Sequence, residues 1–414
     1  MHKLFLLLTA LLILPFHAQA DFDSWLAAFR QEAAEQGISA ATLDAALSDI
    51  TLVERAIELD RRQPEFTLTF VEYLERRITE RQVARGRALM DEHAALLDRV
   101  ERKHGIPKAV LVAFWGLETN YGATLGNFNL PASLATLAYD GRRSAFFRKQ
   151  LLDALHIIDA GHIAAADMKG SWAGAMGHMQ FMPSTFRAYA VDGDGDRRID
   201  LWQSLPDALH SGANYLKRAG WRTGQPVALE VQLPPGFDAS LARVAHRLPV
   251  ARWTALGVLQ ADGGALPFDA GRAAIVLPQG WQGPAFMVFD NFDVVMQWNR
   301  SVSYALTVAQ LARQLGGGSA LVARTGETGA LGMAKLKSLQ QALNALGFDT
   351  GTPDGMLGPL TQSAIRRYQA EHNLPVDGYP AASLLAHVER THAAAAAAGR
   401  LVPVAAPVFW EPPF

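Results

Sequence analysis

The sequence predicts a mainly α-helical protein (α+β) with a small β insertion and a separate small helical module towards its C-terminal end. Three observations lead to this fold class: apolar residues at helical spacing over most of the first 160 residues, short strand-like runs between Gln225 and Phe292, and a glycine-rich break after Leu315. The chain has 414 residues, of which 50% are hydrophobic and 19% are charged, which suits a globular protein of two or three domains. Its formal net charge of −2 gives no reason to expect nucleic acid or an anionic membrane as a partner.

Residues 1–20 have the pattern of a signal peptide. Lys3 precedes the apolar run from Leu4 to Phe16, and Ala18 and Ala20 form a small-x-small pattern that predicts cleavage before Asp21. The run is too short to span a membrane, because about 20 apolar residues are needed. The chain contains no cysteine, which excludes disulfides, thiolate metal sites and a lipidated N-terminal cysteine. We therefore expect an exported protein.

The region from Asp21 to about His104 is predicted to be helical scaffolding. Phe22 and Trp25 begin one apolar face, and a charged amphipathic stretch runs from Arg77 to Lys103. A further helix is predicted from Arg142 to Ala160.

Glu118 is the only acid in the stretch from Ile106 to Gly122, which reads as a buried helix with Pro107 at its first helical position. Glu118 comes at the end of the apolar run, just before a polar turn with Gly122. A carboxyl group in such a place is expected to be poorly solvated, which raises its pKa and suits the general acid of a glycosidase. The alternative is a glutamate that caps or salt-bridges the end of a core helix.

The stretch from Lys169 to Ser184 contains too many glycines for a stable isolated helix. Glycines of this kind allow the backbone to approach a ligand or another element closely, and tight helix packing is the alternative. The stretch is therefore a candidate part of a binding site.

Strands are predicted at Val227–Leu233, Ala274–Leu277 and Phe286–Phe289, separated by proline and glycine, and a helix at Val294–Leu315. Residues 318–333 are predicted to be a linker.

Residues 334–390 are predicted to form the separate module. Four leucines at helical spacing make one face before Gly347 stops the helix: Leu336, Leu339, Leu343 and Leu346. Ile365 and Tyr368 mark a second helix. Residues 391–414, an alanine run and a proline-rich end, are expected to form a poorly ordered tail.

An aspartate-rich loop has the spacing of a calcium-binding EF-hand loop. Acids stand at positions 1, 3, 5 and 9: Asp192, Asp194, Asp196 and Asp200. The loop departs from the pattern because Arg197 replaces the usual glycine at position 6 and Gln203 the glutamate at position 12. A solvated acidic turn is the alternative.

Three motifs, in this order, resemble the membrane-bound-B family of lytic murein transglycosylases: Glu118–Gly122, Gly170–Gly177 and Gln180–Ser184. The resemblance covers roughly Asp21 to Gly317. It is extended by further matches at Ala213–Tyr215, Gly220–Trp221, Trp298–Ser301 and Tyr304. The family implies a lysozyme-like core with additional α and β parts, so that residues 21–317 would be one catalytic domain.

The resemblance implies that Glu118 is the sole catalytic acid/base of a peptidoglycan lytic transglycosylase, a carbon–oxygen lyase. Glu118 would protonate the glycosidic oxygen between N-acetylmuramic acid (MurNAc) and N-acetylglucosamine (GlcNAc) and then deprotonate the MurNAc C6 hydroxyl, which gives a 1,6-anhydro sugar. The acetamido group of the substrate would replace a carboxylate nucleophile. Position in the motifs implies substrate contacts, with structural polar groups as the alternative, for Ser171, Gln180, Tyr215, Asn299 and Tyr304.

The resemblance also implies a structural calcium site and no cofactor for catalysis. Its ligands would be Asp192, Asp194, Asp196, the backbone carbonyl of Arg198 and Asp207. Membrane-bound members carry a lipidated cysteine that this chain lacks, so we expect a soluble periplasmic protein without a membrane anchor.

The C-terminal module resembles the peptidoglycan-binding domain 1 family, a three-helix fold, through Asp354–Thr361, Ala364–Gln369 and Asp377–Gly378. It implies a non-catalytic domain that keeps the enzyme on its polymer. The expected partners are peptidoglycan glycan strands and enzymes of cell-wall synthesis or hydrolysis, and we expect a monomer. Two alternatives stay open: a hydrolytic muramidase on the same fold, and a scaffold that binds peptidoglycan without cutting it.

Overall fold

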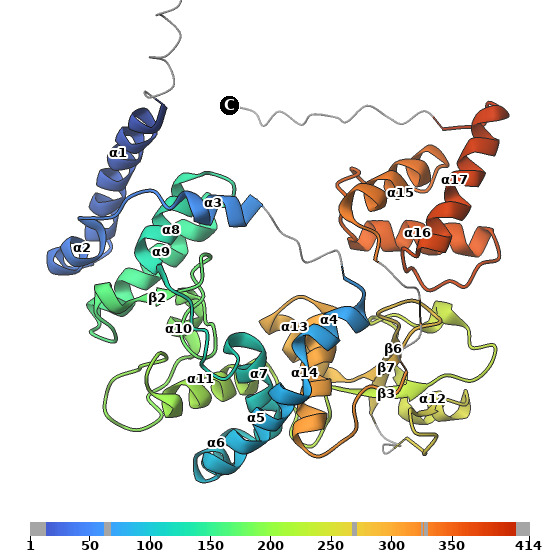
Figure 1. The fold of residues 1–414 in the computed structure, drawn as a ribbon, viewed down its shortest axis with the longest axis horizontal. Helices are drawn as coiled ribbons and strands as arrows, with labels where there is room; N and C mark the ends of the chain where they lie inside the picture. Colours follow the sequence, from blue (N-terminus) through green and yellow to red (C-terminus); the bar gives the residue numbers. More distant parts are fainter. Residues whose placement is uncertain (1–13, 62–67, 267–270, 324–325, 327–329, 403–414) are drawn as a thin grey trace, which may run out of the picture. The chain divides into compact units, whose positions relative to one another are not determined.

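The computed structural model describes five parts of the chain: residues 14–61, 68–266, 271–323, 326 and 330–402. The described residues form two compact units: unit 1 lies within residues 1–63 and 85–219, and unit 2 within residues 64–84 and 220–414 (Figure 1). Residues 1–13 of the predicted signal peptide and 403–414 of the predicted tail lie outside the described residues.

Unit 1 is built from helices, as predicted. They are α1 (Leu14–Glu35), α2 (Ala40–Leu47), α3 (Glu54–Arg61), α6 (Ala94–His104), α7 (Lys108–Thr119), α8 (Leu130–Tyr139), α9 (Ser144–Asp159), α10 (Pro183–Tyr189) and α11 (Leu205–Arg218). Two strands of two residues, β1 (Phe128–Asn129) and β2 (Lys169–Gly170), pair antiparallel. Helix α5 (Glu80–Glu92) begins in unit 2 and ends in unit 1.

Local capping and breaks divide the helical region predicted from Asp21 to His104 into α1 to α6. Ser39 caps α2 by accepting a hydrogen bond from the backbone of Thr42. Ile78 takes an extended conformation (φ −121°, ψ 94°) after α4 (Phe70–Arg77), and His93 separates α5 from α6. The long amphipathic stretch is therefore two helices.

Helix α7 forms the buried centre of unit 1. Every residue from Val110 to Leu117 is buried, which agrees with the predicted core helix. One detail differs: Pro107 has a ψ of 133°, an extended value, so it is the N-cap and the helix begins at Lys108. Gly105, at φ 73°, ends α6 immediately before this turn.

Unit 2 contains a five-stranded antiparallel sheet in the order β4-β6-β7-β3-β5. Its strands are β3 (Ala228–Gln232), β4 (Leu248–Pro249), β5 (Leu259–Gln260), β6 (Arg272–Val276) and β7 (Ala285–Val288). The three predicted strands form its centre, with Met287 of β7 opposite Leu229 of β3 and Ile275 of β6. Helix α12 (Val250–Ala255) supplies Trp253 to the core, where its indole N–H donates to Ala273 O at 2.9 Å.

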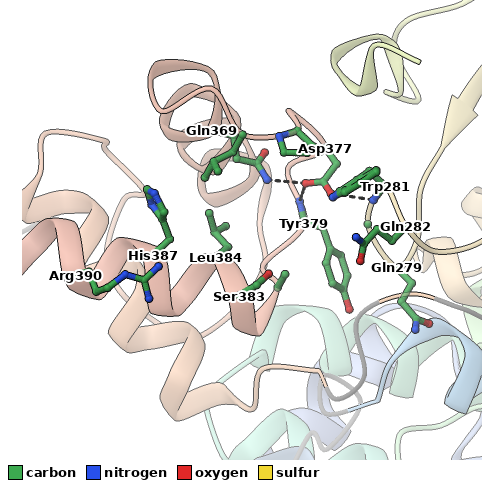
Figure 2. A pocket seen from close by; sticks show the side chains of 14 residues that line it. Gln279, Trp281, Gln282, Gln369, Asp377, Tyr379, Ser383, Leu384, His387 and Arg390 are labelled. Atoms are coloured by element: carbon green, nitrogen blue, oxygen red, sulfur yellow. Dashed lines mark hydrogen bonds between the residues drawn. The ribbon is translucent and has the colours of Figure 1, made fainter. Parts of the chain in front are cut away.

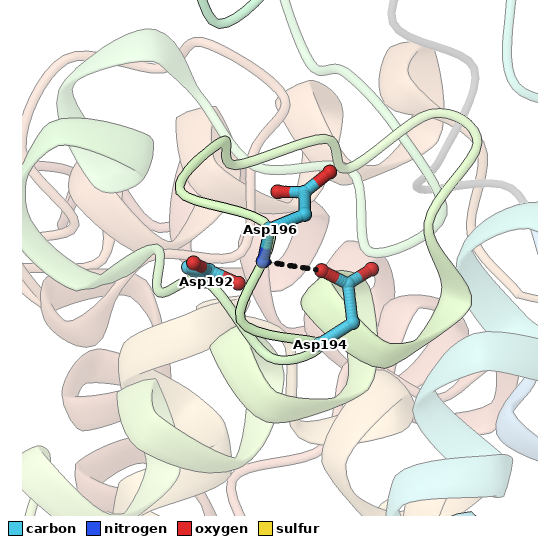
Figure 3. A group of neighbouring side chains, drawn as sticks. All are labelled: Asp192, Asp194 and Asp196. Atoms are coloured by element: carbon cyan, nitrogen blue, oxygen red, sulfur yellow. Dashed lines mark hydrogen bonds between the residues drawn. The ribbon is translucent and has the colours of Figure 1, made fainter.

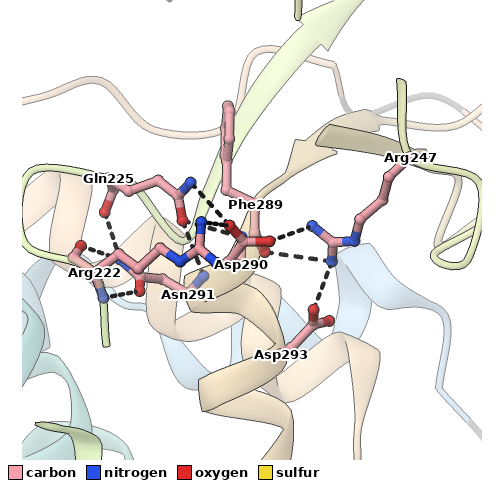
Figure 4. A network of polar contacts seen from close by, with 7 residues as sticks. All are labelled: Arg222, Gln225, Arg247, Phe289, Asp290, Asn291 and Asp293. Carbon is pink, nitrogen blue, oxygen red and sulfur yellow. Dashed lines mark hydrogen bonds and ion pairs between the residues drawn. The ribbon is translucent and has the colours of Figure 1, made fainter. Parts of the chain in front are cut away.

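A polar network fixes the segment that follows Gly220 to the start of α13 (Asp290–Trp298) (Figure 4). The Asn291 side chain is fully buried, accepts from Arg222 N at 2.7 Å and donates to the carbonyl of Gln225 at 2.6 Å. Arg247 pairs with Asp293 at 2.8 Å. The buried amide thereby meets its hydrogen-bonding requirement through backbone groups of a loop.

The single helix predicted at Val294–Leu315 is wrong, because two helices occupy this region. Helix α13 ends at Trp298, and α14 (Val302–Leu315) begins after Ser301. The hydroxyl of Ser301 accepts from Tyr304 N at 3.2 Å, so a capping residue starts the second helix.

The C-terminal module consists of α15 (Met333–Ala345), α16 (Pro359–Glu371) and α17 (Ala382–Ala397), which pack around a common core. Three of the four predicted leucines are buried in that core and Leu346 packs against it. The alanine run predicted to be poorly ordered is helical as far as Ala397. Alanine has the highest helix propensity, and the run continues a helix that the module core already holds.

The segment between α14 and α15 forms no helix or strand in its described residues, but it is attached to the sheet. Glu230 of β3 is buried, and its carboxylate accepts from Val322 N at 3.0 Å and from Ala323 N at 2.7 Å. The first half of this connection is therefore held in place.

Candidate active site

Glu118 lies in the last turn of α7 and is partly exposed, whereas Leu117 and Thr119 beside it are buried. The helix ends at Thr119, and its C-cap Asn120 has a left-handed φ of 49°. A single carboxyl group thus emerges at the end of a buried helix, as predicted.

The end of α7 is joined to the glycine-rich stretch through Thr119. The Thr119 hydroxyl donates to His178 O at 3.0 Å and accepts from Gly122 N at 3.0 Å. The Trp115 indole donates to His178 Nδ1 at 3.0 Å, which places the proton of the neutral ring on Nε2. Burial lowers the pKa of His178, which keeps the ring neutral near pH 7.

Glycines permit this close approach. A Cβ on Gly122 (φ 79°) would lie 2.4 Å from His178 Cε1, and one on Gly177 (φ 70°) would lie 2.5 Å from Leu201 O. A Cβ on Gly170 would lie 2.2 Å from Ala175 O. These glycines therefore serve the contact of backbone with another element, which is one of the two uses predicted for them.

Tyr121, in the turn after Glu118, packs back against α7, with its ring centroid 5.7 Å from that of Trp115. It is buried, with a left-handed φ of 59°, and a Cβ on Gly116 would lie 2.7 Å from its ring. The Arg85 guanidinium lies 5.8 Å from the ring centroid. Burial raises the pKa of Tyr121 to about 12, so its hydroxyl stays protonated.

Ser171 and Gln180 both make hydrogen bonds to backbone. Ser171 Oγ accepts from Ala175 N at 3.0 Å. Gln180 has a left-handed φ of 48°, and its side-chain nitrogen donates to Leu125 O at 3.2 Å and Gly177 O at 3.1 Å. Both residues thus shape the loop next to α7, and both are partly exposed.

Tyr215 lies on α11 and packs against the same loop. Its ring centroid is 4.7 Å from that of Tyr189 and 6.1 Å from that of Phe181. Burial raises the pKa of its hydroxyl. Tyr215 therefore lies against Phe181, the residue that follows Gln180.

Asn299 and Tyr304 belong to unit 2, so their place beside Glu118 stays a prediction. Asn299 is exposed at the C-terminal end of α13, and Tyr304 is buried in the first turn of α14.

The hydrogen bonds by which Thr119 and Trp115 join α7 to His178 were not predicted from the sequence. All three stand in or next to the motifs that were recognised. Only His178, a titratable side chain between Gly177 and Met179, offered a signal, and hydrogen bonds over 59 and 63 residues cannot be read from spacing.

The aspartate-rich loop gathers three carboxylates. One oxygen from each of Asp192, Asp194 and Asp196 lies within 4.8 Å of the others (Figure 3). Backbone N–H groups of Gly195 and Arg197 lower the pKa of Asp192. Oxygen ligands at this density suit a hard cation such as Ca²⁺.

Asp207 stands outside this group of three. It is buried, and its two oxygens accept from Gly193 N and Asp200 N at 2.7 Å each. Burial raises its pKa. In this structure Asp207 fixes both ends of the loop backbone, while the Arg198 side chain donates to His162 O at 2.7 Å.

Across the described residues, we find no helix that combines the length and the apolar character needed to cross a bilayer.

Comparisons with known proteins give consistent results for both parts of the chain. Residues 21–313 match the model of the transglycosylase SLT domain, and residues 333–387 match that of a peptidoglycan binding domain. Membrane-bound lytic murein transglycosylase B of Escherichia coli K12 is 33% identical over 253 residues, which are 59% of this chain and 66% of that protein. The matched chain thus spans about two thirds of the length of this relative.

Solved structures are similar as well. SltB3 from Pseudomonas aeruginosa in complex with NAG-anhNAM-pentapeptide has a TM-score of 0.86 and 44% identity, over 89% of this chain and 99% of that chain. The Escherichia coli lytic transglycosylase Slt35 in complex with calcium has a TM-score of 0.61 and 27% identity, over 70% of this chain and 92% of that chain. The chain therefore belongs to the transglycosylase SLT domain family of lytic murein transglycosylases and carries a C-terminal domain of the peptidoglycan-binding family.

Proposed function

We propose that the protein cleaves the β-1,4 bond between MurNAc and GlcNAc in peptidoglycan and leaves 1,6-anhydro-MurNAc ends, with Glu118 as sole acid/base. The observation that carries this is the emergence of Glu118 from the buried helix α7 beside the glycine-rich loop. The last turn of a helix faces the negative end of the helix dipole, which opposes ionisation of a carboxylate there. The similarity to SltB3, solved with an anhydro muropeptide, supports the product.

In the proposed reaction the proton of Glu118 moves to the glycosidic oxygen while the bond from this oxygen to C1 of MurNAc breaks. The substrate's acetamido group stabilises the charge at C1. The ionised Glu118 then takes the proton of the C6 hydroxyl as O6 bonds to C1, which restores the acid. No water is consumed, and the glycosidic bond is replaced by an intramolecular ether.

Five further residues are proposed to contact the substrate: Ser171, Gln180, Tyr215, Asn299 and Tyr304. The hydrogen bonds of Ser171 and Gln180 to backbone support a role in shaping the loop that the sugar would meet. Exposure at the end of α13 makes Asn299 available to a ligand.

Digestion of purified sacculi, followed by mass spectrometry of the released muropeptides, tests the proposal. Wild-type protein should release products that lack the mass of one water, and Glu118→Gln should release none. The matched control is Glu80→Gln, at an exposed glutamate in the first turn of α5, which should act like wild type. Reducing ends would establish a hydrolytic muramidase instead. Binding without any product would establish a scaffold.

We also propose a structural Ca²⁺ held by Asp192, Asp194 and Asp196, with Asp207 and the Arg198 carbonyl as further ligands. The three gathered carboxylates and the calcium complex of Slt35 support it. Calcium would neutralise the repulsion within the loop and stabilise the fold next to α11.

We propose a soluble periplasmic protein and residue boundaries of 21–317 for the catalytic domain and 334–390 for the peptidoglycan-binding domain. The family matches at residues 21–313 and 333–387 support these boundaries. Peptidoglycan as substrate supports the location.

A further inference from the structure

Unit 2 contains a cavity where the loop after β6 meets the C-terminal module (Figure 2). Its volume is about 160 Å³, comparable to an engineered cavity of about 150 Å³ that holds one benzene ring. The loop contributes Trp281, and the module contributes Tyr379, His387 and Arg390. Trp281 is 52% exposed, so about half of its side-chain surface is open to a ligand at this cavity.

One carboxylate holds the two walls of this cavity together. Asp377 is buried, and it accepts from Trp281 N, Tyr379 N and Gln369 Nε2 at 2.9, 2.9 and 2.7 Å. The loop also packs tightly: a Cβ on Gly280 (φ 76°) would lie 3.1 Å from the Tyr379 ring. The cavity is therefore preformed, which lowers the entropic cost of binding a ligand.

The described lining of the cavity carries one carboxylate and one permanent cation, and the two differ in how far they are already paired. Asp377 is its one acidic lining residue among the described residues, and three donors already satisfy it. Arg390 is exposed on α17 and forms no ion pair with a described carboxylate. Burial, with His372 and Arg390 nearby, lowers the pKa of His387, whose Nδ1 lies 2.8 Å from Tyr368 Oη. The permanent cation is thus Arg390.

We propose that this cavity is an accessory binding site for a carboxylate-bearing fragment of peptidoglycan, with Trp281 packing against an apolar or sugar face and Arg390 pairing with the carboxylate. An exposed indole offers a large rigid surface, and a guanidinium binds a carboxylate through two parallel hydrogen bonds. The inference rests on the proposed function for the polymer, but not on the cleavage chemistry. The carboxylate could belong to the muramic acid of a peptide-free glycan or to the end of the stem peptide.

Fluorine NMR on the full-length protein tests this site separately from the catalytic cleft. The chain has nine tryptophans, and in Glu118→Gln protein labelled with 5-fluorotryptophan the added change Trp281→Phe identifies the Trp281 resonance. The probes are NAG-NAM-pentapeptide, NAG-NAM with its free carboxyl group, and the free pentapeptide. We expect the Trp281 resonance to shift with the first probe and with the one fragment that carries the recognised carboxylate.

Arg390→Ala should weaken the binding reported by Trp281 about tenfold or more, the usual effect of losing a charged hydrogen-bond partner. The matched control is Arg400→Ala, at an exposed arginine outside the cavity lining, which should leave that binding unchanged. A Trp281 resonance that stays still at saturating probe, while other tryptophan resonances move, would overturn the inference. So would unchanged binding in Arg390→Ala. Failure of the proposed function would show differently, as absent anhydro products from wild-type protein.

Discussion

Thr119, next to the proposed acid, hydrogen-bonds the end of α7 to the glycine-rich stretch. Its hydroxyl satisfies both the carbonyl of His178 and the N–H of Gly122. Since Thr119 is buried, loss of the hydroxyl would leave two polar backbone groups unpaired at the end of α7. We therefore expect the end of α7, and with it Glu118, to lose its fixed position when this hydroxyl is removed.

We expect Thr119→Val to lower kcat for anhydro-product release by at least about tenfold and to cost about 1–3 kcal/mol of stability. Thr119→Ser keeps the hydroxyl and should recover most of both. Product release from sacculi and urea unfolding give the two measurements. If the valine variant lost stability but kept wild-type kcat, the positioning role would be wrong.

His104 makes stability depend on pH. It is buried beside His210, with 3.0 Å between His104 Nε2 and His210 Nδ1, and its Nδ1 has no hydrogen-bond partner among the described residues. Burial, and then the nearby His210, lower the pKa of His104 to about 4 from its ordinary 6.5. Between these values the unfolded chain binds a proton that the folded protein does not, so stability falls as the pH falls from 6.5 towards 4.

The loss should be on the order of 2–3 kcal/mol between about pH 7.5 and about pH 4.5. Urea unfolding at the two pH values measures it. His104→Leu should make the difference between the two pH values clearly smaller, whatever it does to stability at either one. An equal pH difference in both proteins would exclude His104 as its source.

At the scale of elements, the aspartate-rich loop is expected to gain stability from calcium. At a free concentration 100 times its dissociation constant, Ca²⁺ should stabilise the protein by about 2.7 kcal/mol and raise its Tm over that in EDTA. Asp194→Asn should abolish most of this gain, while Asp167→Asn, at an exposed acid outside the cluster, should keep it. Thermal unfolding with and without Ca²⁺ measures this gain. A wild-type Tm that Ca²⁺ does not change would show that the loop is a solvated acidic turn without a bound metal.

Several elements could be predicted from the sequence because their signals are local. The apolar run that ends at Glu118 and the leucine face of α15 are examples, and both are confirmed. The break between α13 and α14 escaped prediction because the flanking helices share one apolar pattern and only Ser301 marks the cap. Strands of two residues such as β4 and β5 carry no periodicity at all.

The candidate site was predictable only in part, because its motifs are local signals whereas its contacts are not. The motifs located Glu118 and the loop with Ser171 and Gln180, but not the contacts that hold them, which join residues far apart in the chain. Hydrogen bonds through Thr119, His178 and Trp115 depend on how α7 packs, and packing follows from the whole fold.

At the scale of the whole molecule, part of the predicted linker at residues 318–333 is attached to the sheet. The buried carboxylate of Glu230 holds Val322 and Ala323 to the sheet. Glu230→Gln removes the charge from these hydrogen bonds and replaces one acceptor oxygen by a donor, which should weaken the attachment by about 1–3 kcal/mol.

We expect limited proteolysis between α14 and α15 to become several-fold faster in Glu230→Gln, because cleavage requires local release of the backbone. The matched control is Glu389→Gln, at an exposed glutamate on α17, which should be cleaved at the wild-type rate. Mass spectrometry of the fragments locates the cut. Equal rates in all three proteins would show that Glu230 does not restrain this segment.

The hydrogen bond that joins Asp377 to Trp281 N also decides which residues must be moved together when the C-terminal module is transferred to another protein. Trp281 and Asp377 are 96 residues apart, on opposite sides of the connection between α14 and α15. A chimaera that received residues 333–402 alone would leave Asp377 without the Trp281 N–H and would lose one wall of the cavity. The transferable part is therefore the module together with residues 279–282, and exchange between homologues should succeed only where both pieces come from the same parent.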